Sequence, residues 1–334
     1  GSTRFRDALL GVVEWKNDDV SPDPVLLKSD GFPTYHLANV VDDHLMGIGA
    51  VLRAQEWLSS TPMHIILYEA FGWEPPEFCH LPMVMGPDGK KLSKRHGATS
   101  IDEFRKRGFL PAALINYMAL LGASYEEGKE VYSLAELAGL FSLDKLNKAQ
   151  AIFDYKKLEW YNAQYIRMMD GAALAQAALP FAVEMGLFGG GGPSAEQKDL
   201  FVRAMPLVQE RAVFLTDVPQ KLGYLFAEPA VPAAEEFIPK KSSLEAALGL
   251  LSMGREIVGP MAGTDEAGDE GLAKATAERE GVKLGDLLMP LRLAITGARV
   301  SPPLFGSVRL LGAAVCEARV DRALAALRGA LGKR

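Results

Sequence analysis

The sequence predicts a chain with an α/β first part followed by an all-α remainder. Before residue 100, extended apolar runs alternate with short helical patterns, and two of these runs cover 33–41 and 48–52. They are rich in Val and Leu, as buried parallel strands are. Beyond residue 100 the strand signals fade and successive amphipathic helical patterns take over. Segregated signals of this kind indicate an α/β domain with helical domains after it.

The first part is expected to belong to a doubly wound sheet. A helix follows the two runs: Thr61 can cap it, Pro62 lies in its first turn, and Gly72 ends it. Helical periodicity gives this helix an apolar face made of Met63, Ile66, Leu67, Ala70 and Phe71. A short apolar run then ends at Val84-Met85. Strand, helix and strand in this order predict a doubly wound α/β fold.

The second part contains helical patterns separated by breaks. The clearest patterns cover 111–121, 133–141, 200–208 and the apolar stripe from Leu284 to Ile295, which Gly297 ends. Pro290 predicts a kink or a break inside this stripe. The run 189–193, four glycines and a proline, predicts a flexible loop, and it lacks the Lys-Ser/Thr of a phosphate-binding P-loop. The acidic stretch 264–270 is expected to be a second loop.

Composition is typical of a soluble protein of two or more domains. The 334 residues are 49% hydrophobic and 23% charged. No apolar run approaches the roughly 18 residues of a membrane span, and no secretory signal opens the chain. Cys79 and Cys316 lie far apart without metal-ligand spacing, so we expect no structural zinc and no disulfide framework. These observations predict a cytoplasmic protein with no membrane association.

A cationic loop at 90–97 is the most informative segment of the sequence. It holds four cations, a hydroxyl and a glycine, and it follows two turn dipeptides at 86–89. The net charge of −6 argues against indiscriminate nucleic-acid binding. The segment from Asp88 to Arg107, however, contains seven cations and only three acids. A local positive patch in an acidic chain predicts a focused contact with polyphosphate.

Polar side chains near the predicted strands are candidates for ligand binding. Arg53 directly follows the run 48–52, and Tyr35 lies within the run 33–41. Ligands of open α/β sheets bind at the carboxyl ends of strands, and arginine grips a carboxylate with two parallel hydrogen bonds. Glu56 follows in a loop, where it can accept from ribose hydroxyls or an amine.

Taken together, these segments resemble the glutamyl-tRNA synthetase family. The order Lys91-Leu92-Ser93-Lys94-Arg95 looks like the second ATP signature of class I aminoacyl-tRNA synthetases. The blocks that narrow the resemblance, in family order and at family spacing, are 31–38, 40–47, 51–62 and 108–117. The likeness continues through 153–167 and more faintly to 281–292.

The resemblance implies a division of the chain into four parts. Residues 1–98 are expected to be the second half of a class I Rossmann-like catalytic domain with the tail of its acceptor-stem insertion. A stem-contact helical region follows at 99–168. Two helical anticodon-binding subdomains then cover 169–228 and 229–334.

The resemblance also implies site residues and partners. Tyr35 and Arg53 should contact L-glutamate, with Arg53 on its carboxylate. Glu56 and the backbone near Met85 should lie against ATP, which enters with Mg²⁺. Lys94 should reach the phosphates, and Ser93 and Lys91 should shape the loop. A mobile lysine neutralises the charge that develops on the α-phosphate and the departing pyrophosphate.

The helical half carries the candidate for tRNA recognition. Arg211 lies where the family reads an anticodon base of tRNA(Glu), and arginine can stack on a splayed base or bond its edge. Arg292, Arg299 and Arg309 are weaker candidates for contact with the RNA backbone. The whole enzyme is expected to be a monomer.

The sequence departs from the family pattern by an absence. It contains no first ATP signature of the His-Ile-Gly-His kind, and Gly1-Ser2 reads as a cloning scar. We therefore expect a truncated glutamate–tRNA ligase that is inactive alone, because half a site cannot align the reacting atoms. Two alternatives stay open: a non-catalytic tRNA-binding protein, and a glutamine-specific or tRNA-modifying relative. The long helical half argues against the second.

Overall fold

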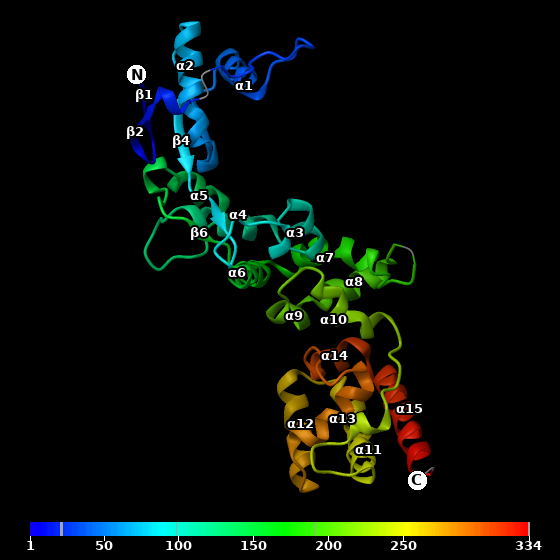
Figure 1. Cartoon of the computed structure of the whole chain (residues 1–334). Helices are drawn as coiled ribbons and strands as arrows, with labels where there is room; N and C mark the ends of the chain where they lie inside the picture. Colours follow the sequence, from blue (N-terminus) through cyan, green and yellow to red (C-terminus); the bar gives the residue numbers. More distant parts are fainter. Residues whose placement is uncertain (21–22, 98, 191, 333–334) are drawn as a thin grey trace. The chain divides into compact units, whose positions relative to one another are not determined.

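The computed structural model describes residues 1–20, 23–97, 99–190 and 192–332. They form two compact units. The N-terminal unit comprises Gly1–Phe104 and Pro111–Tyr161, and the helical unit comprises Arg105–Leu110 and Asn162–Arg334. Figure 1 shows the N-terminal unit in blue to green and the helical unit mainly in green to red. The predicted boundary at Ala98 and Gly191 of the glycine run lie outside the described residues.

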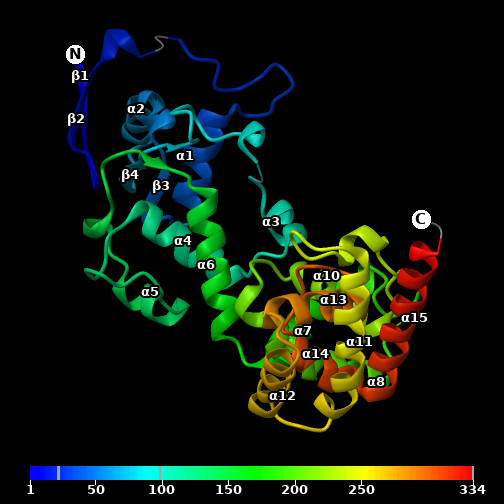
Figure 2. The same cartoon turned by 90° about the horizontal axis from the view of Figure 1, so that it is seen from below.

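A four-stranded sheet organises the N-terminal unit. Its strands are β1 (Ser2–Asp7), β2 (Gly11–Lys16), β3 (Ala50–Ala54) and β4 (Glu77–Leu81), in the order β2-β1-β4-β3. β1 pairs antiparallel with β2, whereas β4 pairs parallel with both β1 and β3. The parallel strands confirm the α/β class. Figure 2 shows β3 and β4 beside the helices α1 (Tyr35–Leu45) and α2 (Thr61–Phe71).

The remaining elements of this unit follow the sheet. They are η1 (Asn17–Asp19), η2 (Gln55–Ser60), β5 (Val84–Met85), η3 (Lys94–His96), α4 (Pro111–Gly122), α5 (Leu134–Leu140), η4 (Leu143–Lys145) and β6 (Ala151–Ile152). The helices α3 (Ile101–Arg107) and α6 (Tyr155–Met168) begin in this unit. The predicted helices at 111–121 and 133–141 are confirmed as α4 and α5. Ser133 caps α5 and exchanges bonds with Glu136, which explains why the start of this helix could be predicted.

The predicted strand at 33–41 is wrong, because this segment forms α1. Leu37, Val40 and Val41 have the spacing of a helix face, and only Val40 is fully buried in α1. A run rich in Val and Leu can therefore form either a buried strand or one face of a helix. Here the helical spacing of these residues indicates a helix. The strand predicted at 48–52 is confirmed with a shift of two residues, as β3, and Arg53 lies inside it.

The ends of α2 were predicted better than its face. Pro62 lies in the first turn and Gly72 ends the helix with φ 69°, but Thr61 is helical and Ser60 precedes it as the cap residue. The buried residues of α2 are Thr61, Pro62, His64, Ile65, Leu67 and Tyr68, so the predicted face is wrong. Apolar residues surround this helix on nearly all sides, which leaves periodicity unable to select one face.

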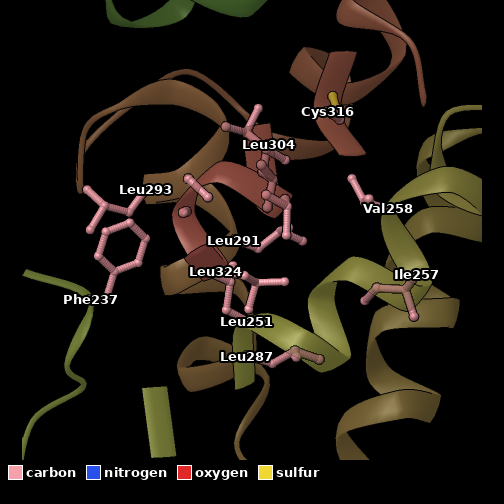
Figure 3. Packing of buried hydrophobic residues seen from close by; sticks show 14 of the residues in the cluster. Phe237, Leu251, Ile257, Val258, Leu287, Leu291, Leu293, Leu304, Cys316 and Leu324 are labelled. Carbon is pink, nitrogen blue, oxygen red and sulfur yellow. The ribbon is translucent and has the colours of Figure 1, made fainter. Parts of the chain in front are cut away.

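The helical unit contains two buried clusters. The first lies among residues 166–225 and the second among residues 237–327. Their elements are α7 (Gly171–Glu184), α8 (Ala195–Arg203), α9 (Met205–Val208), η5 (Gln209–Arg211), α10 (Asp217–Phe226), η6 (Ala234–Phe237), α11 (Leu244–Met261), α12 (Glu266–Arg279), α13 (Leu284–Thr296), α14 (Leu304–Leu311) and α15 (Ala313–Leu331). Figure 3 shows Leu251, Leu291 and Leu324, from α11, α13 and α15, within the second cluster.

Three details of the helical half differ from prediction. The pattern 200–208 is divided at Ala204, where α8 ends before the Pro206 turn of α9. The acidic stretch 264–270 is not a loop: Asp265 caps α12, and acids suit a helix N-terminus. The helix α13 continues through Pro290 without a break.

Each unit contains one buried free cysteine. Cys79 lies in β4 and Cys316 in α15. Burial raises the pKa of Cys79 and raises that of Cys316 to about 12. Among the described residues, no helix combines the length and apolar character needed to span a membrane.

Candidate functional site

The lysine-rich loop begins as a tight hairpin. Val84 and Met85 form β5, and Met85 bridges back to Lys91. The Leu92 amide donates to the Val84 carbonyl at 3.0 Å, and the Gly86 amide donates to the Lys90 carbonyl at 2.7 Å. The chain turns between Gly86 and Lys90, and the hairpin places the loop directly beside β5.

The second half of the loop is held by Ser93 and His96. The Ser93 amide donates to His96 Nδ1 at 3.0 Å, so Nδ1 accepts and Nε2 donates to Asp88 at 3.1 Å. A Cβ on Gly86 would lie 2.9 Å from the His96 ring, so the hairpin needs glycine there. Lys94 between them is exposed, and within the described chain its Nζ has no hydrogen bond or ion pair. An exposed cation on a supported loop suits a phosphate contact.

Lys91, which was predicted to shape the loop, contacts Glu56, which was predicted to lie against ATP. Lys91 Nζ lies 2.5 Å from an Oε2 of Glu56, which is carried by η2 just after β3. The Met85 carbonyl accepts from the Phe153 amide at 2.8 Å, and β5 pairs with β6. Lys91, Glu56 and Met85 thus lie on neighbouring segments of the N-terminal unit.

The predicted glutamate residues also come together. Arg53 lies near the carboxyl end of β3, and Tyr35 is the first residue of α1. Burial lowers the pKa of Arg53, and the neighbouring Tyr35 acts in the opposite direction. The Tyr35 ring centroid lies 4.8 Å from that of Trp57. One turn further along α1, Asn39 Oδ1 is buried without a partner among the described residues. This oxygen is suited to accept a hydrogen bond from a ligand.

Arg53 and Lys91 line a common cavity of about 350 Å³. Leu81, Pro82 and Val84, between β4 and the loop, complete much of its wall. The cavity therefore joins Arg53, the candidate for carboxylate binding, to the loop that was predicted to bind phosphate. This grouping of an arginine with a lysine is suited to an anionic substrate that spans both.

The sequence did not reveal the hydrogen-bonded network around Arg53. Its guanidinium contacts three buried side chains, Thr61, His64 and His80, and the ring of His80 contacts buried Asp7. A signal was present, because all five histidines of the chain fall between His36 and His96. Histidine exchanges protons near neutral pH more readily than other side chains. A cluster of histidines in the sequence therefore indicates a candidate functional site even when no motif is recognised.

This network predicts an acid-sensitive N-terminal unit. The pKa of His64 is lowered to about 3, mainly by burial and then by Arg53. The unfolded chain therefore binds a proton below about pH 6.5 that the folded chain does not bind until about pH 3. The free energy of unfolding should therefore be highest above about pH 6.5 and fall as the pH drops below it, by up to ~1.4 kcal/mol per pH unit. The pKa of His80 is lowered too, which adds in the same direction.

Urea titrations followed by tryptophan fluorescence measure this effect, because all four tryptophans lie in the N-terminal unit. The stability loss from about pH 7 to about pH 5 should be smaller in His64→Gln than in the wild type. His44→Gln, which alters a ring stacked on Trp73, is the control and should keep the wild-type slope. Equal slopes in the wild type and His64→Gln would show that His64 is not held neutral.

The helical unit places Arg211 beside a second cavity. Arg211 is exposed on η5, and its Nη1 donates to the Ser301 carbonyl at 3.0 Å. The cavity, of about 240 Å³, is also lined by Lys221, Tyr224 and Thr296. An exposed arginine over a mainly apolar hollow is compatible with stacking on a splayed base.

The three weaker arginine candidates are bound to their own chain. Arg292 Nη1 donates to the Ser301 hydroxyl at 2.7 Å and to the Pro302 carbonyl at 2.8 Å. Arg299 donates to the Glu236 carbonyl, and Arg309 pairs with the buried Asp269. These contacts give each of them a structural role in the helical unit.

Within the described ranges, no three His, Cys, Asp or Glu side chains lie close enough to hold a metal ion. The site holds Glu56, Met85 and Lys94, which were predicted to contact ATP, and Lys91, which was predicted to shape the loop. These residues fit a triphosphate, because two of them are cations on a supported loop.

Comparisons with known proteins match both units. The family model for the catalytic domain of class I tRNA synthetases (E and Q) matches residues 1–160, and that for an anticodon binding domain matches 173–324. The chain is 52% identical to the glutamate–tRNA ligase of Treponema denticola, covering 97% of this chain and 68% of the relative. The Treponema pallidum ligase is 50% identical, with 97% and 64% covered. The Thermus thermophilus ligase is 43% identical, with 97% and 67% covered.

A solved structure matches in the same way. The crystal structure of a glutamate–tRNA ligase from Elizabethkingia meningosepticum, in complex with its amino acid, superposes with a TM-score of 0.77 at 30% identity. The match covers 98% of this chain and 66% of that one. The chain thus spans about two thirds of the length of these relatives.

Proposed function

Because the chain belongs to the glutamate–tRNA ligase family of class I tRNA synthetases, we propose that it serves the ATP-dependent charging of tRNA(Glu). In this reaction a glutamate carboxylate oxygen attacks the α-phosphorus of ATP and pyrophosphate departs. The terminal ribose hydroxyl of the tRNA then takes the glutamyl group, and AMP leaves. The observation that carries the proposal is the cavity shared by Arg53 and Lys91.

Residues of the N-terminal unit divide the work of binding. Tyr35 and Arg53 hold glutamate, with a free guanidinium nitrogen of Arg53 on its carboxylate. The Met85 segment and Glu56 lie against ATP. Lys94 reaches the phosphates from a loop whose shape Ser93 and Lys91 maintain. Mg²⁺ bound with ATP would neutralise part of the phosphate charge.

The remaining parts are assigned to tRNA. Residues 99–168 contact the stem, and the two helical parts, 169–228 and 229–334, read the anticodon, with Arg211 on one of its bases. The cavity beside the exposed Arg211 supports this assignment. We assign the activity to the cytoplasm and to a monomeric enzyme that does not act at a membrane. Two unpaired cysteines support a reducing compartment.

Binding of a tRNA(Glu) transcript, with an ATP–glutamate activation assay on the same sample, tests the function. Arg211→Ala should weaken binding roughly tenfold or more, as loss of a base-contacting arginine does. Arg203→Ala, an exposed arginine paired with Asp199 in the same unit, is the matched control and should bind normally.

The two readouts separate the possibilities. Binding that depends on Arg211, without adenylate formation, would indicate a working anticodon module whose chain does not activate glutamate alone. Pyrophosphate exchange that requires Lys94 would support the full reaction in this chain. Absence of tRNA binding at low salt would contradict the assignment of the helical unit.

A further inference from the structure

A buried chain of hydrogen bonds connects Asp7 to Arg53. Asp7 ends β1 and is 1% exposed. Its Oδ1 accepts from the amides of Leu9 and Leu10 at 2.9 and 2.8 Å. Its Oδ2 accepts from the His80 amide at 3.0 Å and lies 2.6 Å from His80 Nδ1. A carboxylate oxygen can only accept, so His80 Nδ1 donates to it.

The opposite nitrogen of His80 faces Arg53. His80 Nε2 lies 3.1 Å from Arg53 Nε. A guanidinium donates and never accepts, so Nε2 must carry a lone pair. Both contacts are satisfied by one form of the ring, neutral with its proton on Nδ1. Burial, which lowers the pKa of His80, favours that neutral ring.

A second nitrogen of Arg53 is also held, and its partner Thr61 Oγ1 lies 3.0 Å from His80 Nε2. Its Nη2 donates to Thr61 Oγ1 at 2.8 Å and lies 3.3 Å from His64 Nδ1. His64 Nε2 in turn lies 2.9 Å from His36 Nδ1. Arg53 Nη1 is buried without a partner among the described residues. Two nitrogens of the guanidinium, Nε and Nη2, are therefore bonded, and the third, Nη1, is left for a ligand.

We propose that Asp7 and His80 are positioning residues that hold the Arg53 guanidinium in the plane where its free nitrogen receives a ligand carboxylate. The inference rests on the proposed role of Arg53 in binding glutamate. Asp7 acts by selecting the tautomer of His80, and neither residue touches the ligand. In Asp7→Asn, the amide oxygen stays with the Leu9 and Leu10 amides, so the amide nitrogen faces His80 Nδ1 and moves the ring proton to Nε2. His80 Nε2–H then turns to Thr61 Oγ1, 3.0 Å away, and Arg53 Nε–H loses its acceptor.

Nitrogen-15 spectra of the full chain test this directly. In the wild type, His80 should be neutral with its proton on Nδ1, and Arg53 Nε–H should exchange slowly with water. In Asp7→Asn the proton should move to Nε2, and exchange of Arg53 Nε–H should accelerate roughly tenfold. Glu77→Gln, an exposed carboxylate three residues before His80 on β4, is the control and should change neither signal. His80→Gln keeps an acceptor for Arg53 and should retain most of the slow exchange.

Titration of the same samples with L-glutamate separates the two ideas. If Asp7 acts through His80, Asp7→Asn should bind glutamate roughly tenfold more weakly than the wild type. The double variant Asp7→Asn, His80→Gln should then bind no more weakly than His80→Gln alone. A wild-type His80 protonated on Nε2, or unchanged glutamate binding in Asp7→Asn, overturns the inference. Spectra that change as expected in a chain that binds no glutamate would support positioning and contradict the role proposed for Arg53.

Discussion

Replacing the buried Arg319 with leucine is expected to destabilise the helical unit by about 2–6 kcal/mol, from two buried carbonyls at about 1–3 kcal/mol each. Arg319 lies in α15 and is 4% exposed. Its Nη1 donates to the Ile295 carbonyl at 2.7 Å, in the last turn of α13. Its Nη2 donates to the Tyr224 carbonyl at 2.9 Å, in the last turn of α10. Leucine fills the space but leaves both buried carbonyls without a donor.

The loss should appear as a lower urea midpoint in far-ultraviolet circular dichroism, while tryptophan fluorescence of the N-terminal unit stays unchanged. Arg322→Leu is the matched control. Arg322 lies one turn further along α15 and pairs with Glu228 at the surface, so its loss should cost less than about 1 kcal/mol. Arg319→Lys should fall between the two, because one ammonium cannot reach both helix ends. Equal midpoints for Arg319→Leu and Arg322→Leu would show that the two carbonyls find other donors.

Gly108→Ala is expected to destabilise the same unit by on the order of 3 kcal/mol. Gly108 has φ 86°, a conformation that is strained for alanine. An added Cβ would also lie 2.8 Å from the Thr216 nitrogen and 2.9 Å from the Leu215 nitrogen. These are backbone atoms, and the Leu215 amide donates to the Gly108 carbonyl at 2.9 Å, so the neighbour cannot move without losing that bond.

Gly186→Ala separates backbone strain from the clash. Gly186 has φ 71° in the same unit, and a Cβ added there would meet no atom within 4 Å, so only the strain of about 1 kcal/mol applies. Far-ultraviolet circular dichroism in urea measures both variants. A Gly108→Ala protein no less stable than Gly186→Ala would contradict the close approach of 105–110 to residues 215–216.

The sequence predicted the architecture where local chemistry was unambiguous. The Ser133 capping box, Pro62 and Gly72 each act within a few residues, so they set helix ends that the structure retains. The run 33–41 was misassigned because apolar content alone does not distinguish a strand from a helix with one covered side. Pro290 was expected to interrupt α13, but the helix continues through it with Leu287, Leu291 and Leu293 fully buried. Tertiary burial outweighed the local cost.

The site divides in the same way. Lys91, Ser93 and Lys94 lie within four residues, so a motif predicted them together, and the structure adds the Glu56 contact. Nothing in the sequence connects Asp7 with His80, because 73 residues separate them and only the pairing of β1 with β4 brings them together. The roles assigned to these residues in catalysis stay predictions.

The alkylation rate of each buried thiol reports how fast its own unit opens. Only the thiolate reacts with alkylating reagents, and a buried thiol reacts only after its surroundings open. The alkylation rate of Cys79 therefore measures the opening of the sheet, and that of Cys316 measures the opening of the α15 region. With reagent in excess, mass spectrometry of the two cysteine peptides yields two rates from one sample. Their ratio ranks the kinetic resistance of the two units without cutting the chain between them.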